Sequence, residues 1–317
     1  MPVTRRHFTS LAGLWAALAA LPVKAASKSQ GAEGNTPASE SSKDRGDSAA
    51  YGKKAPALFI GHGDPMNILQ DNTFTRDWDA LGERFSQPDV KPRAILMVSA
   101  HWETPGVEVS LADKPAMIYD FYGFPDEMYQ QNYPAPGAPE IAKGLWKADF
   151  SQRILADNSR GLDHGAWCVL MRLFPKADVP VFQLSLSRNI HSADHFLLGQ
   201  ELRQLREQGV MIIGSGNITH NMRSWQQDYR TGRTHLVHDW ARYFDAKIVE
   251  RINNHEYAAL ADYLQYGRAA QMSVPTPEHY LPLLYVAASA YEDEKAEYFA
   301  EGFEAGSFSM RSVLFNG

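Results

Sequence analysis

The 317-residue chain has only one cysteine, Cys168, and this absence of thiols narrows the possibilities at once. A single cysteine forms no disulfide within the chain and builds no cysteine-based zinc or iron–sulfur site. Stability must therefore come from the hydrophobic core. The apolar, helix-like sequence GAWCVLMRLF around Cys168 favours a buried small side chain over a nucleophile.

Basic clusters and long apolar runs are also missing. The formal net charge is −6, and a nucleic-acid surface needs concentrated positive charge, so that class of partner is not expected. After residue 26 no stretch reaches the roughly 18 apolar residues of a membrane span, so we expect no membrane contact once the leader is removed. No heptad or interface stripe indicates an oligomeric state.

The first 26 residues have the order of an export signal. A charged start at residues 4–8 (TRRHF) is followed by the apolar stretch Leu11–Leu21 and a small-residue cleavage site. Arg5 and Arg6 resemble the twin-arginine signal, which exports folded proteins; an ordinary secretory signal is the alternative. We therefore expect a twin-arginine signal peptide at 1–26 and a periplasmic protein.

Residues 27–54 are rich in Ser, Gly, Ala and charged residues. Such a composition buries too little apolar surface to offset the entropy lost on ordering, so we expect a disordered linker. Residues 55–317 then form the mature domain, whose length is within the range of one α/β domain.

Short apolar runs rich in β-branched residues alternate with helical patterns over this domain. The runs predict strands buried on both faces at Ala57–Gly61, Ala94–Ser99, Val181–Ser185 and Val210–Gly214. Apolar spacings of three and four predict helices at Thr73–Phe85, Ala193–Gln208 and His238–Ile252. The alternation predicts a single α/β domain with a central, largely parallel or mixed sheet flanked by helices. We also expect a final strand at Ser307–Phe315 and a solvated acidic face at Glu292–Glu304.

The segment Pro115–Pro139 holds several tyrosines and phenylalanines among five prolines, which is too irregular for a strand or a helix. It is either a wall for a flat substrate or a rigid loop packed on its own rings.

Four histidines from distant segments follow apolar runs or lie in a proline-bounded turn. They are His62 in GHGDP, His101 in SAHW, His220 in GSGNITH and His279 in PTPEHYLPL. The carboxyl ends of parallel strands meet at one crevice, where such side chains converge. One histidine of this kind is usually a satisfied core residue, but several indicate a shared metal site.

Two more segments offer polar groups. Pro277 suits the first position of a helix, which would place Glu278 in its first turn, either as a metal ligand or as a partner of the neighbouring histidine; a capped helix start with a solvated pair is the alternative. Asp163 and His164 open a predicted helix that runs through Leu173, and a plain helix cap explains them equally well. The remaining histidines of the domain, to which we assign no role, are at positions 191, 195, 235, 238 and 255.

In this order, the segments GHGDP, SAHW, GSGNITHN and PTPEHYLPL resemble the class III extradiol ring-cleavage dioxygenases, in particular the DOPA-4,5-dioxygenase branch. The resemblance covers the chain from about Pro56 to its end and implies an α/β domain around a mixed sheet. It implies that His62 and His101 bind one divalent metal. The third ligand is expected to be His279, with Glu278 as the alternative.

The same resemblance implies that His220 is the catalytic acid/base and lies near enough to complete the metal shell. It implies that His164 contacts the substrate. One departure is Val274, where plant members carry a histidine before the proline-rich run. This puts in doubt the transfer of the plant substrate to this chain.

The resemblance implies a small aromatic diol and O₂ as substrates, Fe(II) as cofactor and a ring-opened semialdehyde as product. A histidine-rich site also binds Zn(II), which has no redox chemistry to offer O₂. Two alternatives stay open: a zinc hydrolase using His220 as base, and a non-enzymatic metal- or ligand-binding protein. The sequence does not identify the catechol.

Overall fold

The computed structural model describes residues 54–316. The expected signal peptide, and all of the expected linker except Lys54, lie outside these residues. Over the described range, none of the helices is both long enough and apolar enough to cross a membrane.

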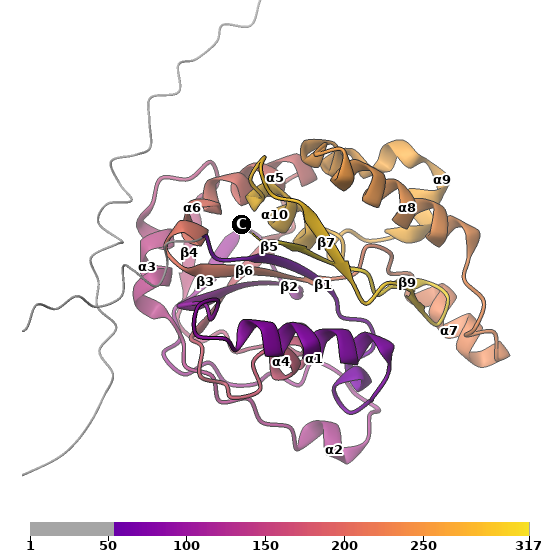
Figure 1. The fold of residues 1–317 in the computed structure, drawn as a ribbon, viewed down its shortest axis with the longest axis horizontal. Coiled ribbons are helices and arrows are strands. Elements are labelled where there is room, and N and C mark those ends of the chain that lie inside the picture. Colours follow the sequence, from indigo (N-terminus) through magenta and orange to yellow (C-terminus); the bar gives the residue numbers. More distant parts are fainter. Residues whose placement is uncertain (1–53, 317) are drawn as a thin grey trace, which may run out of the picture.

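An eight-stranded mixed sheet forms the centre of the domain, in the order β4-β3-β5-β2-β6-β1-β10-β7 (Figure 1). The adjacent strands β5, β2, β6 and β1 are parallel to one another, whereas β10 runs antiparallel to both of its neighbours, β1 and β7. The strands are β1 Ala57–Gly61, β2 Ala94–Thr104, β3 Val107–Ser110, β4 Ile154–Asp157, β5 Val181–Ser187, β6 Val210–Gly216, β7 Ala296–Phe299 and β10 Ser312–Phe315. A separate hairpin consists of β8 Phe303–Glu304 and β9 Phe308–Ser309. The predicted mixed α/β fold is confirmed.

Helices cover both faces of this sheet. Figure 1 shows α1 (Thr73–Phe85) and α4 (His164–Leu173) on one face and α5 (Ser192–Leu202) and α10 (Leu281–Ser289) on the other. The remaining helical segments are η3 Pro65–Ile68, α2 Asp126–Tyr129, α3 Pro139–Lys147, α6 Gln204–Glu207, α7 Met222–Thr231, α8 Asp239–Asn253, η4 Tyr257–Tyr266 and α9 Arg268–Ser273. Because both faces are covered, every residue of β1 and of β6 is buried, which explains their continuous apolar sequences.

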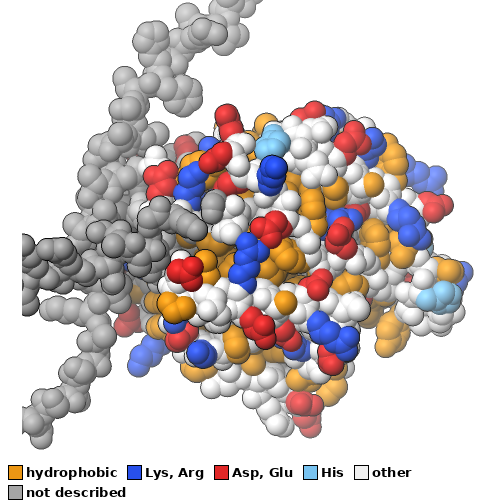
Figure 2. All heavy atoms as spheres, in the orientation of Figure 1, with side chains coloured by type: hydrophobic (Ala, Val, Ile, Leu, Met, Phe, Trp, Pro, Cys, Tyr) orange, Lys and Arg blue, Asp and Glu red, His pale blue; other side chains and the backbone are white. Residues whose placement is uncertain are grey.

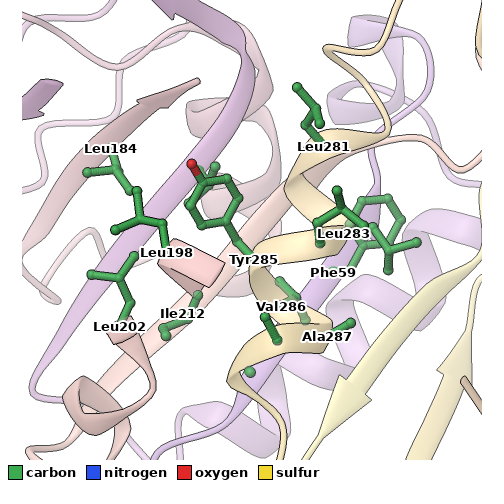
Figure 3. Close-up of a cluster of buried hydrophobic side chains, with 14 of the residues drawn as sticks. Phe59, Leu184, Leu198, Leu202, Ile212, Leu281, Leu283, Tyr285, Val286 and Ala287 are labelled. Carbon is green, nitrogen blue, oxygen red and sulfur yellow. The ribbon is translucent and has the colours of Figure 1, made fainter. Parts of the chain in front are cut away.

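Each face of the sheet has its own hydrophobic core. Leu58 of β1 belongs to the cluster that contains Trp78 and Trp167. The next residue, Phe59, belongs to the opposite cluster, because successive strand side chains point to opposite faces. Figure 3 shows this second core, where Tyr285 and Val286 of α10 lie over the sheet. α10 also packs against β1 and β6, and so fixes the segment just before it, which holds His279.

Charged side chains of both signs are interspersed over the face shown in Figure 2. Several charged side chains of the domain pair at short range, such as Arg84 with Glu297 at 2.8 Å and Lys91 with Asp178 at 2.7 Å. Exposed pairs of this kind contribute at most about 1 kcal/mol each.

Three expectations from the sequence, for segments between residues 193 and 315, need correction. The helix expected over Ala193–Gln208 is divided at Arg203, whose N–H bonds to the carbonyl of Gln200 three residues back and tightens the turn. The segment 292–304 has the expected solvated side chains at Glu292, Glu297 and Glu301, but it also contains strands β7 and β8. Its Glu294 is 2% exposed and forms an ion pair with the fully buried Arg206.

The single strand expected over Ser307–Phe315 is divided into β9 and β10. The division occurs because the Ser309 N–H bonds to Thr219 rather than to a strand of the main sheet, at 2.9 Å from the hydroxyl and 3.2 Å from the carbonyl.

Candidate metal centre

Three of the predicted histidines converge at one end of the parallel strands. His62 follows β1, His101 lies in β2, and His279 lies in the turn before α10. One nitrogen from each lies within 4.8 Å of the others. β1 and β2 flank β6 on opposite sides, so they deliver His62 and His101 to the same crevice.

His101 lies inside β2 rather than after it, which corrects the expected end of that strand. The pairing of β2 with β5 shifts register between Val98 and Glu103. Such a bulge re-aims side chains locally. The His101 N–H bonds to the hydroxyl of Ser99 at 3.2 Å within the shifted segment.

The spacing of the nitrogens fits a divalent metal ion. The Nε2 atoms of His62 and His101 are 3.4 Å apart. Two imidazole nitrogens each about 2.1 Å from one ion, at a tetrahedral angle, would also be about 3.4 Å apart. Among the described residues, the buried Nε2 of His279 has no hydrogen-bond partner. A buried polar atom without a partner is costly, and a metal ion would satisfy it.

Each of these histidines has an oxygen atom near its other nitrogen, Nδ1. For His62 this is the Ser215 hydroxyl at 2.8 Å, which itself donates to the Gly165 carbonyl at 2.6 Å. Because that hydroxyl proton is already used, Ser215 accepts from His62 Nδ1–H. This arrangement keeps the lone pair of His62 on Nε2, the nitrogen that approaches His101.

For His279 and His101, the oxygen atom near Nδ1 belongs to a carboxylate. Glu278 lies 3.0 Å from Nδ1 of His279 and also accepts from the Thr276 hydroxyl at 2.9 Å. Asp120 lies 3.7 Å from Nδ1 of His101. Sequence reasoning identified Glu278 but missed Asp120 and Ser215. Ser215 lies in the recognised GSGN motif, whereas Asp120 lies in a loop without a local signal.

The helix expected to begin at Pro277 begins at Leu281 instead. The preceding residues form a turn in which the Tyr280 N–H bonds to the Pro277 carbonyl at 2.9 Å. A helix from Pro277 would place Pro282 in its interior, where proline lacks the required N–H and clashes with the preceding turn. As the second residue of α10, Pro282 is tolerated, and His279 is left in the turn.

His220 lies beside the three-histidine group, with its ring stacked on His279. The ring centroids are 3.5 Å apart and the planes differ by 5°. The nitrogens of His220 group with those of His279 and with the Glu278 carboxylate, rather than with those of His62 and His101.

His164 is the first residue of α4, and Asp163 caps that helix by accepting from the Ala166 N–H. Its ring lies 3.9 Å from the ring of His101. Nδ1 and the backbone N–H of His164 both lie 2.9 Å from the same oxygen of Asp120. The Asp120 carboxylate therefore fixes both the ring and the start of the helix. Burial alone would raise the pKa of Asp120, but these contacts with His164 lower it to about 2.

The aromatic loop Pro115–Pro139 packs on its own rings, as one interpretation of its sequence predicted. Its rings pack on one another, with Phe121 5.0 Å from Phe124 and 5.2 Å from Tyr129. The ring of Phe121 also lies 5.8 Å from the ring of His164, so the loop reaches the neighbourhood of the candidate site.

Burial favours the uncharged form of four histidines, His62, His101, His220 and His279. It lowers the pKa of His62 and of His279 well below the usual value, and neighbouring imidazoles lower both further. The pKa values of His101 and His220 fall to about 3, again chiefly through burial. Neutral imidazole is the form that binds metal, so the site is prepared for a cation at neutral pH.

Two other expectations concern residues outside the site. Cys168 is buried in α4, and burial raises its thiol pKa well above the usual value, as suits a core side chain rather than a nucleophile. The buried His195 bonds to the Tyr285 hydroxyl at 2.8 Å, away from the metal centre.

Residues 56–315 match the family model described as the catalytic LigB subunit of aromatic ring-opening dioxygenase. A protein of Escherichia coli K12 named 4,5-DOPA dioxygenase extradiol is 40% identical over 82% of this chain and 94% of its own length. A Beta vulgaris protein of the same name is 37% identical over 81% of this chain and 95% of its own. The crystal structure of an uncharacterized Escherichia coli K12 protein superposes with a TM-score of 0.69, at 37% identity over 82% of this chain and 99% of that one.

Proposed function

Since the chain belongs to the LigB family of extradiol ring-cleavage dioxygenases, we propose that it opens a DOPA-like catechol ring with O₂ and Fe(II). The metal ligands in this proposal are His62, His101 and His279. The observation that carries it is the convergence of three neutral imidazoles, one of which has a buried Nε2 without a partner.

A bound Fe(II) ion would supply the open coordination positions and the electron transfer that O₂ chemistry requires. Zn(II) would fit the same donors but would leave the enzyme inactive. In this proposal, the side chains around the metal position hold and orient the catechol and O₂, and the rings of the aromatic loop lie beside them.

His220 is proposed as the acid/base. It would remove a proton from a catechol hydroxyl and return one to the product oxygen as the ring opens. An uncharged imidazole has the free nitrogen lone pair that accepts this first proton, and the imidazolium that forms can then return it. We assign a substrate contact to His164, because its Nδ1 faces the Asp120 carboxylate at 2.9 Å and its Nε2 is the nitrogen left for a ligand.

Oxygen uptake by protein reconstituted anaerobically with Fe(II) tests this function. DOPA and unsubstituted catechol should both be offered, and a new visible absorbance should accompany uptake with the preferred ring. The Zn(II)-loaded protein is the matched control and should consume no oxygen. Tight catechol binding without uptake in the Fe(II) form would overturn the proposal and favour a binding or zinc-dependent role.

We further propose that residues 1–26 direct the folded protein to the periplasm by the twin-arginine route. Folding before export would let the cytoplasm select the metal. Replacing Arg5 and Arg6 by lysine should retain the protein inside the cell, as shown by fractionation. Unchanged export of that variant would contradict the assignment.

A further inference from the structure

The ring of His220 is stacked between two other rings. No side-chain hydrogen bond to its nitrogens is present among residues 54–316, although its backbone N–H bonds to the Ser273 carbonyl at 2.8 Å. One face of the ring lies on His279. The other face lies on Phe308, at a centroid distance of 4.3 Å and an interplanar angle of 22°. The imidazole is therefore held between two rings.

Phe308 has little freedom to move. It is 2% exposed, and the Trp225 ring of α7 lies 6.1 Å behind it at 14° to its plane. The four rings from His279 to Trp225 thus form one stack, in which Phe308 is the only member that touches His220 on its outer face.

The strand that carries Phe308 is bonded directly to the loop that carries His220. The Thr219 hydroxyl donates to the Ser307 carbonyl at 2.9 Å and accepts from the Ser309 N–H at 2.9 Å. The Asn217 amide donates to the Ser309 carbonyl at 2.8 Å. These bonds align β9 with the segment 217–221, so Phe308 and His220 are held in register.

The other strand of the hairpin is bonded to the loop that carries His62. The Glu304 carboxylate accepts from the Asp64 N–H at 2.9 Å and from the Asn67 amide at 3.2 Å. Gly63, between His62 and Asp64, has a φ of +59°, a conformation that favours glycine, and its Cα lies close to the same carboxylate. The hairpin β8–β9 therefore connects the loop of a metal ligand with the loop of the proposed acid/base.

We propose that Phe308 is a positioning residue, which sets the orientation of the His220 ring relative to the metal centre. The expected effect of Phe308 on catalysis rests on the proposed function, whereas its effect on the orientation of the His220 ring does not. A stacking partner suits this task, because it restrains the ring plane and leaves both nitrogens available for proton transfer. A hydrogen-bonding partner would occupy one of them.

The kinetic test compares Phe308→Leu with Phe308→Tyr in the Fe(II)-loaded protein. Leucine loses the flat ring face and tyrosine keeps it. Phe308→Leu should lower kcat by at least about tenfold, with KM nearly unchanged and full metal content, since small misplacements of a catalytic group have large effects on rate. Phe308→Tyr should keep most of the wild-type kcat.

A matched control is Phe174→Leu, a similar change in a buried ring that stacks on Phe85, 6.0 Å away, and not on His220. It should lower the melting temperature comparably and leave kcat unchanged. Equal kcat in the two leucine variants would overturn the proposal. If Phe308→Leu fails to fold, Phe308→Met fills a similar volume and replaces it in the comparison.

A spectroscopic measurement tests the geometry without turnover. In histidine-labelled, Zn(II)-loaded protein, the ring protons of His220, assigned with His220→Ala, should be shifted upfield by the adjacent rings. Phe308→Leu should reduce that shift, and Phe174→Leu should not. An unchanged His220 shift in Phe308→Leu would overturn the positioning role. If the wild type consumes no oxygen but the His220 ring protons show the expected upfield shift, only the proposed function is overturned.

Discussion

Replacing Ser215 by alanine should weaken metal binding although Ser215 would touch no metal. Its hydroxyl is fully buried and accepts from Nδ1 of His62 at 2.8 Å. Without that acceptor, the imidazole proton is free to move to Nε2, the nitrogen needed for the metal. The ring also loses the contact that sets its orientation.

The size of the effect follows from this single contact. Loss of a group that orients a ligand histidine typically lowers metal affinity by about 10–100-fold. This range corresponds to about 1.4–2.7 kcal/mol of binding free energy. The Gly165 carbonyl loses its donor in the same variant, so folding stability should also fall by about 1–3 kcal/mol. Only the change in affinity reports on His62.

Ser289→Ala provides the matched control. The Ser289 hydroxyl is also fully buried and donates to a carbonyl, that of Val286, at 2.8 Å, but it contacts no histidine. Zn(II) affinity measured by competition with a chelator should fall in Ser215→Ala and stay at the wild-type value in Ser289→Ala. Affinity of Ser215→Ala within about twofold of wild type would refute the argument that this serine prepares His62.

Three further predictions concern other parts of the domain. Glu294→Gln should lower the free energy of unfolding by about 3–5 kcal/mol in urea titrations, since the Arg206 charge would remain buried without its partner; a loss below 1 kcal/mol would contradict this. Burial lowers the pKa of His195 to about 4, so the unfolded chain binds the extra proton first and stability is lost as the pH falls from about 6.5 towards 4. Between pH 7 and pH 5 this residue should account for about 2 kcal/mol, and His195→Gln should reduce the loss of unfolding free energy over this range by that amount. His220→Ala should lower the oxygen-uptake rate by at least about 100-fold with an unchanged far-UV spectrum, whereas a near wild-type rate would rule out its role as acid/base.

Local sequence predicted most of the scaffold correctly. β1, β5 and β6 occur where continuous apolar runs were found, and α1 has the predicted bounds Thr73–Phe85. The predictions failed where a distant partner decides the backbone. The Ser309 N–H bonds to Thr219 instead of to a strand of the main sheet. Glu294 is buried because Arg206 pairs with it.

The candidate site could be predicted as a set of residues but not as an arrangement. His62, His101, His220 and His279 were recognisable from their positions after strands or between prolines. The stacking of His220 on His279, by contrast, has no counterpart in the sequence pattern. The contact between Asp120 and His164 also had no local signal, because it joins an irregular loop to a helix start.

The sequence by itself determined the α/β class, the buried strands and the residue types available for a metal centre, because these depend on hydrophobic periodicity and on near neighbours along the chain. Only the tertiary structure decided which nitrogens converge and what orients them. Ser215 reaches His62 across 153 positions, and Glu304 reaches Asp64 across 240. Such contacts depend on the packing of the whole domain around the sheet, which local patterns do not encode.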